Sequence, residues 1–184
     1  MLIHSRRKNL PAFAGLSVEL GSVFLLSLNI RQMLIDKTSR RILRELQRDG
    51  RITVQELAER VGLSSSPCWR RVKELEKAQV IRRYTVEVDR QRVGLAACMW
   101  LHISIARHTE GAVEAFEKAM LARPEVVELY ETTGDADYLV KVLVPDIPAY
   151  DSFLRDFVFK LPGLAQVRTH VSLRELKCET ALPL

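Results

Sequence analysis

Residues 62–84 read GLSSSPCWRRVKELEKAQVIRRY and place a cysteine, a tryptophan and six basic side chains in one short run. Such a mixture fits a reactive thiol, a metal ligand, a nucleic-acid-binding helix or an ordinary amphipathic helix. The direction of each side chain separates these possibilities, because an α-helix turns about 100° per residue.

A helical wheel divides this run into two faces. With Cys68 set at the origin, Val72 falls at about 40° and Leu75 at about 340°, so the three share an apolar face. Cys68 is therefore predicted to be a small core residue rather than a reactive thiol. The opposite face carries a hydroxyl and cations, and its members with their two flanking residues are Ser66, Arg70, Lys73, Lys77, Trp69 and Arg71. This face suits a recognition helix in the major groove of DNA, but a solvated helix surface would carry the same residues.

An earlier helix is expected to begin after Asp36, because aspartate is a favoured N-cap residue. Ile42, Leu43 and Leu46 follow at helical spacing and would form its buried stripe. The pattern ends before Asp49, which is followed by a glycine. The sequence therefore predicts a first helix of about three turns.

The second helix has signals at both ends. Thr53 and Glu56 have the spacing of a capping box, and Gly62 is placed to end the helix. Ser66 and Pro67 then read as the N-cap and the first residue of a third helix. Two short helices joined by a tight turn predict a helix-turn-helix.

The segment after the third helix alternates between apolar and polar residues. Val80, Tyr84, Val86 and Val88 would lie on one side and Arg83, Thr85 and Glu87 on the other. A pair of strands ending near residues 89–94 would form a wing that brings Arg82 and Arg83 close to a DNA backbone. Residues 34–93 are thus predicted to be a winged helix-turn-helix domain.

The net charge of +5 is distributed unevenly along the chain. Residues 33–93 contain 15 Lys/Arg and 9 Asp/Glu, whereas residues 94–184 contain 9 and 13. This contrast predicts two modules, of which the first faces a polyanion. Charge alone favours that interpretation no more than a solvated charged surface.

The pattern of residues 94–184 predicts the order strand, helix, strand, strand, helix, strand, with residues 134–137 as the turn of a hairpin. This order is that of a ferredoxin-like fold, so the chain is expected to be of the α+β class. One face of such a sheet lacks helices, and a second copy of the chain is expected to cover it.

Residues 1–33 differ from the rest. A basic start and an apolar run imitate a secretory signal, but Glu19 interrupts the run and no cleavage pattern follows. The run is also marginal for a membrane span, which needs about 20 apolar residues. We expect an extension outside the core fold and no association with a membrane. A membrane-anchored regulator is the alternative.

The three cysteines, Cys68, Cys98 and Cys178, are widely spaced and form no CxxC pair. They predict neither a disulfide framework nor a zinc site, and their odd number fits the reducing cytoplasm. The four histidines lack metal-binding spacing, so no metal and no cofactor are expected. The sequence also lacks a phosphate-binding loop, a catalytic triad and a buried carboxylate pair, and an enzyme is therefore not expected.

Three blocks of the chain carry a family resemblance. DKTSRRILRELQRDGRITVQELAERVGLSSSPCWRRVKELEKAQVIRRYTVEVD is the first, TTGDADYLVKVLVPDIPAYDSFL the second and LPGLAQVRTHVSLRELKCETALPL the last. Over about residues 34–184 the chain resembles the leucine-responsive regulatory protein/AsnC family of transcription regulators. The resemblance implies a DNA-binding domain followed by an amino-acid-responsive dimerisation domain, and dimers that commonly assemble into octamers.

The resemblance also implies site residues. The family's helix-turn-helix corresponds to Val54–Lys73. With the wheel and the basic segment after it, the predicted contacts to double-stranded DNA are Ser64, Ser65, Ser66, Trp69, Arg70, Arg71, Lys73, Lys77, Arg82 and Arg83. A small amino acid would bind between dimers at Gly134, Asp135, Asp137 and Tyr138. From the residues alone, a simple polar hairpin turn is the more natural interpretation of that segment.

An aliphatic effector, with a branched-chain amino acid first, is expected from the apolar residues Leu129, Leu139 and Val171. The predicted function is sequence-specific transcriptional regulation in which oligomeric state and DNA affinity respond to this amino acid. A metal- or thiol-responsive winged-helix repressor is the alternative.

Overall fold

The computed structural model describes residues 35–106 and 111–184, so the predicted extension, residues 1–33, lies outside the described residues. The chain divides into two compact units, which are described separately. Among the described residues, the first unit contains residues 35–84 together with Ala181–Leu184, and the second contains Thr85–Thr180. The sequence pattern instead predicts that these last four residues belong to the second domain, residues 94–184.

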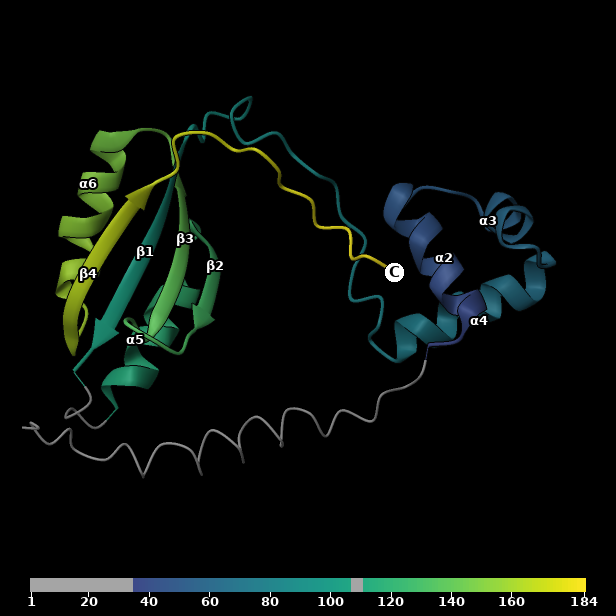
Figure 1. Ribbon diagram of the computed structural model, residues 1–184, viewed down its shortest axis with the longest axis horizontal. Coiled ribbons are helices and arrows are strands. Elements are labelled where there is room, and N and C mark those ends of the chain that lie inside the picture. Colours follow the sequence, from purple (N-terminus) through teal and green to yellow (C-terminus); the bar gives the residue numbers. More distant parts are fainter. Residues whose placement is uncertain (1–34, 107–110) are drawn as a thin grey trace, which may run out of the picture. The chain divides into compact units, whose positions relative to one another are not determined.

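The first unit is built from three helices, α2 (Lys37–Arg48), α3 (Val54–Val61) and α4 (Ser65–Lys77) (Figure 1). Their apolar stripes meet in one core, where Ile42 and Cys68 have no exposed surface. The prediction that Cys68 is a core residue is therefore confirmed.

The helix ends follow the signals in the sequence. The carboxylate of Asp36 accepts a hydrogen bond from the backbone N–H of Ser39 at 2.6 Å and caps α2. Thr53 and Glu56 form both hydrogen bonds of a capping box at the start of α3. Gly62 ends that helix in the left-handed conformation, with φ 70°, which glycine adopts without a Cβ penalty.

The start of α4 differs from the prediction. Its N-cap is Ser64 rather than Ser66, so Pro67 is the third residue of the helix instead of the first. Proline is tolerated there because the first N–H groups of a helix have no intrahelical partner in any case. Pro67 therefore does not mark the helix boundary.

The predicted pair of wing strands is wrong for the single chain. Residues 82–89 have no regular secondary structure, and residues 90–94 form a turn. After the turn the chain enters a strand of the second unit, so among residues 35–106 and 111–184 no returning strand forms a ladder with residues 82–89. Alternation of side chains carries no information about whether a partner strand is present.

The second unit has the predicted ferredoxin-like order of elements. Its elements are β1 (Ala97–Ile105), α5 (Ala112–Leu121), β2 (Val126–Glu131), β3 (Tyr138–Val144), α6 (Ile147–Asp156), a 3-10 turn (Val158–Lys160) and β4 (Leu164–Val171). The four strands form one antiparallel sheet in the order β2-β3-β1-β4.

Helices α5 and α6 cover one face of this sheet (Figure 1). Met99, Leu101 and Ile103 of β1 face these helices and have no exposed surface. The residues between them, such as Trp100 and His102, lie on the opposite face, which no helix of the described part of the chain covers. That uncovered face is called the open face below. Within residues 35–106 and 111–184, no helix is long and apolar enough to cross a membrane.

Candidate functional site

The outward face of α4 is the candidate nucleic-acid-binding surface. Arg70 is largely open to solvent: its side chain is 72% exposed, and its Nε lies 3.9 Å from the carboxylate of Glu74. An exposed pair at that distance contributes little free energy, so Arg70 is available to another partner. The other predicted residues that α4 or its N-cap leaves exposed are Ser64, Ser65, Ser66, Trp69, Lys73 and Lys77.

Trp69 and Lys73 form a local pair on this surface. The indole ring is 53% exposed, and the Lys73 ammonium lies 6.0 Å from the ring centroid. The same ammonium donates to the carboxylate of Glu76 at 2.7 Å, which lowers the pKa of Glu76. Lys73 is therefore partly neutralised, whereas Arg70 carries a more available positive charge.

Arg71 holds the helices of the first unit together. Its guanidinium donates to the carboxylate of Asp36 at 2.6 Å and to the hydroxyl of Ser39 at 3.4 Å. The pKa of Asp36 is lowered to about 2, first by the hydrogen bond from the Ser39 backbone and then by that from Arg71. Arg71 thus joins α4 to the beginning of α2. The predicted contact of Arg71 with DNA therefore competes with another role, which is to stabilise the packing of α4 against α2.

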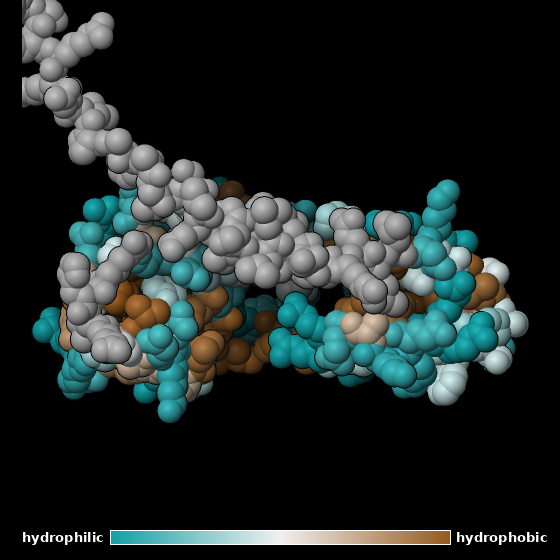
Figure 2. All heavy atoms as spheres, turned by 90° about the horizontal axis from the view of Figure 1, so that it is seen from below, coloured by the Kyte–Doolittle hydropathy of each residue, from teal (hydrophilic) through white to brown (hydrophobic). Residues whose placement is uncertain are grey.

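Arg82 and Arg83 follow α4 in the segment without secondary structure. Both are exposed, and neither makes an ion pair with another residue in the described part of the chain. Figure 2 shows mostly hydrophilic residues over the visible face of the helical unit, on the right. These cations are free to meet phosphates without reading bases.

The predicted effector residues lie in and beside the turn between β2 and β3. Gly134 has φ 127°, a conformation that favours glycine. Asp137 accepts a hydrogen bond from the backbone N–H of Ile105 at 2.9 Å, so its carboxylate holds the turn against the end of β1. Tyr138 is buried on the helical side of the sheet and donates to Glu117 at 2.7 Å. Asp135, by contrast, is exposed.

A hollow of about 220 Å³ lies on the open face beside this turn. Its lining residues come from β1, β4 and the turn: His102, Ser104, Asp135, Ala136, Gln166, Arg168 and His170. Asp135 therefore lines the same hollow as the guanidinium of Arg168 and the imidazoles of His102 and His170, which are not among the site residues predicted from the sequence. Polar residues at alternate positions of β1 and β4 were the available signal, since directly paired residues share a face.

The expected apolar surroundings of the effector are not gathered there. Leu129 pairs with the buried Val140 and packs against the helical core, whereas Leu139 pairs with Tyr130 on the other face. Val171 is half exposed at the far end of β4 and is absent from the hollow. The alternation of a strand places neighbours on opposite faces, so these three residues form no common surface.

The metal- or thiol-responsive alternative depends on the side chains that could bind a metal ion or react with an oxidant. No group of three or more His, Cys, Asp or Glu side chains there is arranged to hold a metal ion. Cys68 and Cys98 are buried, and burial raises the pKa of both thiols, whereas Cys178 is exposed.

A helix-turn-helix unit joined to a ferredoxin-like unit with an uncovered sheet face defines a ligand-responsive DNA-binding regulator. Residues 35–82 match the winged helix-turn-helix DNA-binding family, and residues 98–182 match the Lrp/AsnC ligand binding domain. The chain belongs to the Lrp/AsnC family of transcriptional regulators. The fold class and the regulatory rather than enzymatic function predicted from the sequence are thereby confirmed.

The similarity to known proteins extends over most of the chain. The Bkd operon transcriptional regulator of Pseudomonas aeruginosa is 34% identical over 150 residues, covering 82% of this chain and 98% of that protein. The leucine-responsive regulatory protein of Escherichia coli is 38% identical over 143 residues, covering 78% and 87%. A transcriptional regulator of Neisseria meningitidis in complex with L-Met superposes with a TM-score of 0.77 at 37% identity, covering 80% of this chain and 96% of that one.

Proposed function

We propose that α4 reads base pairs in the major groove and that Arg82 and Arg83 hold the neighbouring phosphates. The observation that supports this most directly is the exposed, weakly paired Arg70 on the outward face, beside Ser66 near the start of α4. Arginine is the residue best suited to a bidentate contact with guanine. Ser64 and Ser65 lie where helix N–H groups favour phosphate.

The effector is proposed to be a small amino acid bound at the hollow on the open face. Arg168 offers a cation for the α-carboxylate and Asp135 an anion for the α-ammonium. Related proteins are named for leucine or bound to L-Met, which supports an aliphatic side chain with a branched-chain amino acid first. Asp137 and Tyr138 would then shape the site from behind, because their side chains are engaged in the fold.

The assembly is proposed to be a homodimer that covers the open face and associates further, with an octamer as the expected state. Trp100 and the Lys141–Glu128 pair lie partly exposed on the open face, which no helix of the described residues covers, and a second copy would complete their burial. A ligand that binds one assembly better than another must change oligomeric state and DNA affinity together.

A thermal-shift screen of the twenty amino acids tests the effector proposal. An aliphatic amino acid should raise the melting temperature of the wild type, and Asp135→Ala should remove most of that shift. Glu114→Ala removes an exposed carboxylate of α5 and is the matched control, which should respond like the wild type. A ligand that stabilises Asp135→Ala as strongly as the wild type would place the site elsewhere.

A thiol-responsive repressor is the competing function, and Cys68 tests it. The Cys68 side chain has no exposed surface, and burial raises the pKa of its thiol, so it stays protonated at neutral pH and reacts poorly. Cys68→Ser should lower the free energy of unfolding by about 1–3 kcal/mol, since a hydroxyl replaces an apolar thiol in the core. Urea denaturation measures this loss. A variant of unchanged stability that no longer responds to oxidants in DNA binding would favour the thiol sensor.

A further inference from the structure

The last four residues of the chain form a bound segment on α2. Gln47 pairs with the backbone of Leu182 in both directions: its amide nitrogen donates to the Leu182 carbonyl at 3.2 Å, and its amide oxygen accepts from the Leu182 N–H at 2.6 Å. Arg44, one helical turn earlier, donates from Nε to the Leu184 carbonyl at 3.0 Å. One face of α2 therefore recognises the backbone of this segment at two points.

A tight turn directs the last side chain toward the core. The Leu184 N–H donates to the Leu182 carbonyl at 2.9 Å across Pro183, which closes a three-residue turn. The fixed φ of proline suits the centre of such a turn. Leu184 consequently packs against the apolar core of the helix-turn-helix unit, together with residues such as Leu46.

The contact is selective for this segment. Leu173 and Leu176, which precede it in the same stretch of chain, are 96% and 79% exposed. Apolar character alone therefore does not bring the stretch onto the first unit. The hydrogen bonds of Gln47 and Arg44 coincide with the one leucine of the stretch that packs against the core.

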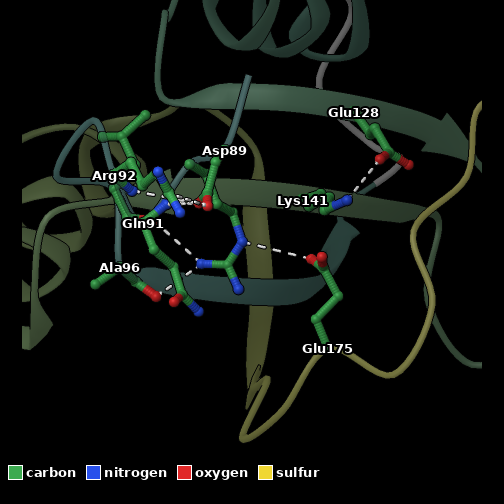
Figure 3. A network of polar contacts seen from close by, with 9 residues as sticks. Asp89, Gln91, Arg92, Ala96, Glu128, Lys141 and Glu175 are labelled. Carbon is green, nitrogen blue, oxygen red and sulfur yellow. Dashed lines mark hydrogen bonds and ion pairs between the residues drawn. The ribbon is translucent and has the colours of Figure 1, made fainter. Parts of the chain in front are cut away.

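The beginning of the same stretch is fixed to the second unit. The Ser172 N–H donates to the Cys98 carbonyl at 2.9 Å. Arg90, which donates to the Leu95 and Ala96 carbonyls, also pairs with Glu175 at 3.4 Å. Figure 3 shows Glu175 in this network, close to the Lys141–Glu128 pair of the sheet.

We propose that Ala181–Leu184 is a docking segment for α2 that fastens the DNA-binding unit to the effector unit. Residues 85–96 already connect the two units. Residues 172–180 then provide a second connection, because the segment that follows them, Ala181–Leu184, is held on the first unit by non-covalent contacts. Two connections restrict the movement of the DNA-binding unit more than a single connection does. In an assembly that binds two half-sites, this restriction raises the effective concentration of the second recognition helix.

Hydrogen exchange tests the docking step without DNA. Leu184→Asp should speed amide exchange in α2, because a carboxylate is expelled from the apolar core. Gln47→Ala, which leaves the core intact, should act in the same direction with a smaller effect. Leu176→Asp introduces the same charge at an exposed leucine of the same stretch and should leave α2 unchanged. Equal exchange in Leu184→Asp and Leu176→Asp would overturn the docking segment.

DNA binding tests the second connection. DNA selected by the wild type from a random pool supplies two half-sites, and the spacing between them is then varied. Leu184→Asp should bind the selected spacing at least about threefold more weakly than Leu176→Asp while binding an isolated half-site equally well. An unchanged preference for spacing would overturn the fastening role. Failure of the wild type to select any DNA would instead contradict DNA binding itself, and the exchange result would be unaffected.

Discussion

Arg70→Ala is expected to lower the affinity for a specific operator by about 1–3 kcal/mol and to relax the preference at one base pair in each half-site. The side chain is exposed near the beginning of α4, and its only ion pair in the described chain, with Glu74, is long and solvated. Its removal therefore leaves no buried group unpaired, and the loss reports a missing contact to DNA rather than a damaged fold. Binding curves on operators altered one base pair at a time measure the effect.

Arg82→Ala is the matched control, because it removes the same cation from a segment without secondary structure. It should weaken binding to all sequences alike and reduce the salt dependence by about one phosphate contact. If Arg70→Ala behaved in the same way, Arg70 would contact phosphate and another residue of α4 would read the bases. Arg71→Ala should differ from both, since loss of its contact with Asp36 loosens α4 from α2 in the absence of DNA.

Local signals in the sequence were sufficient for most of the fold. Asp36 determines the start of α2, and the Thr53–Glu56 capping box and Gly62 determine the two ends of α3, through bonds that span at most four residues. The periodicity that placed Cys68 inward depends only on helix geometry. The order of strands and helices in the second unit followed from the change between alternating and helical patterns.

Local patterns in the sequence could not predict the contacts between distant segments of the chain. Alternation in residues 82–89 indicated extended backbone, but whether a partner strand exists depends on the rest of the chain. The pairing of Arg71 with Asp36 joins residues 35 positions apart, and that of Gln47 with Leu182 joins residues 135 positions apart. The same limit applies to the candidate effector site, where Asp135 of the turn and Arg168 of β4 line one hollow although they are distant in the sequence.

Phe116→Ala is expected to destabilise the second unit by about 3–5 kcal/mol, the usual cost of truncating a buried aromatic residue. Phe116 has no exposed surface and lies on α5, with its ring 4.8 Å from that of Tyr138 on β3. The cavity would separate α5 from the sheet and weaken the turn that carries Asp135. Phe116→Ala should therefore impair amino-acid binding more than DNA binding.

The two tryptophans make the outcome measurable unit by unit, since Trp69 lies on α4 and Trp100 on β1. In denaturation followed by single-tryptophan variants, Phe116→Ala should move the Trp100 transition strongly and the Trp69 transition little. Leu57→Ala, which truncates a buried residue of the helical core, should do the reverse. Each unit has its own apolar cluster, and a cavity in one removes no contact from the other. Equal movement of both transitions would show that the units unfold as one cooperative body, with a coupling much stronger than the few contacts of Ala181–Leu184 provide.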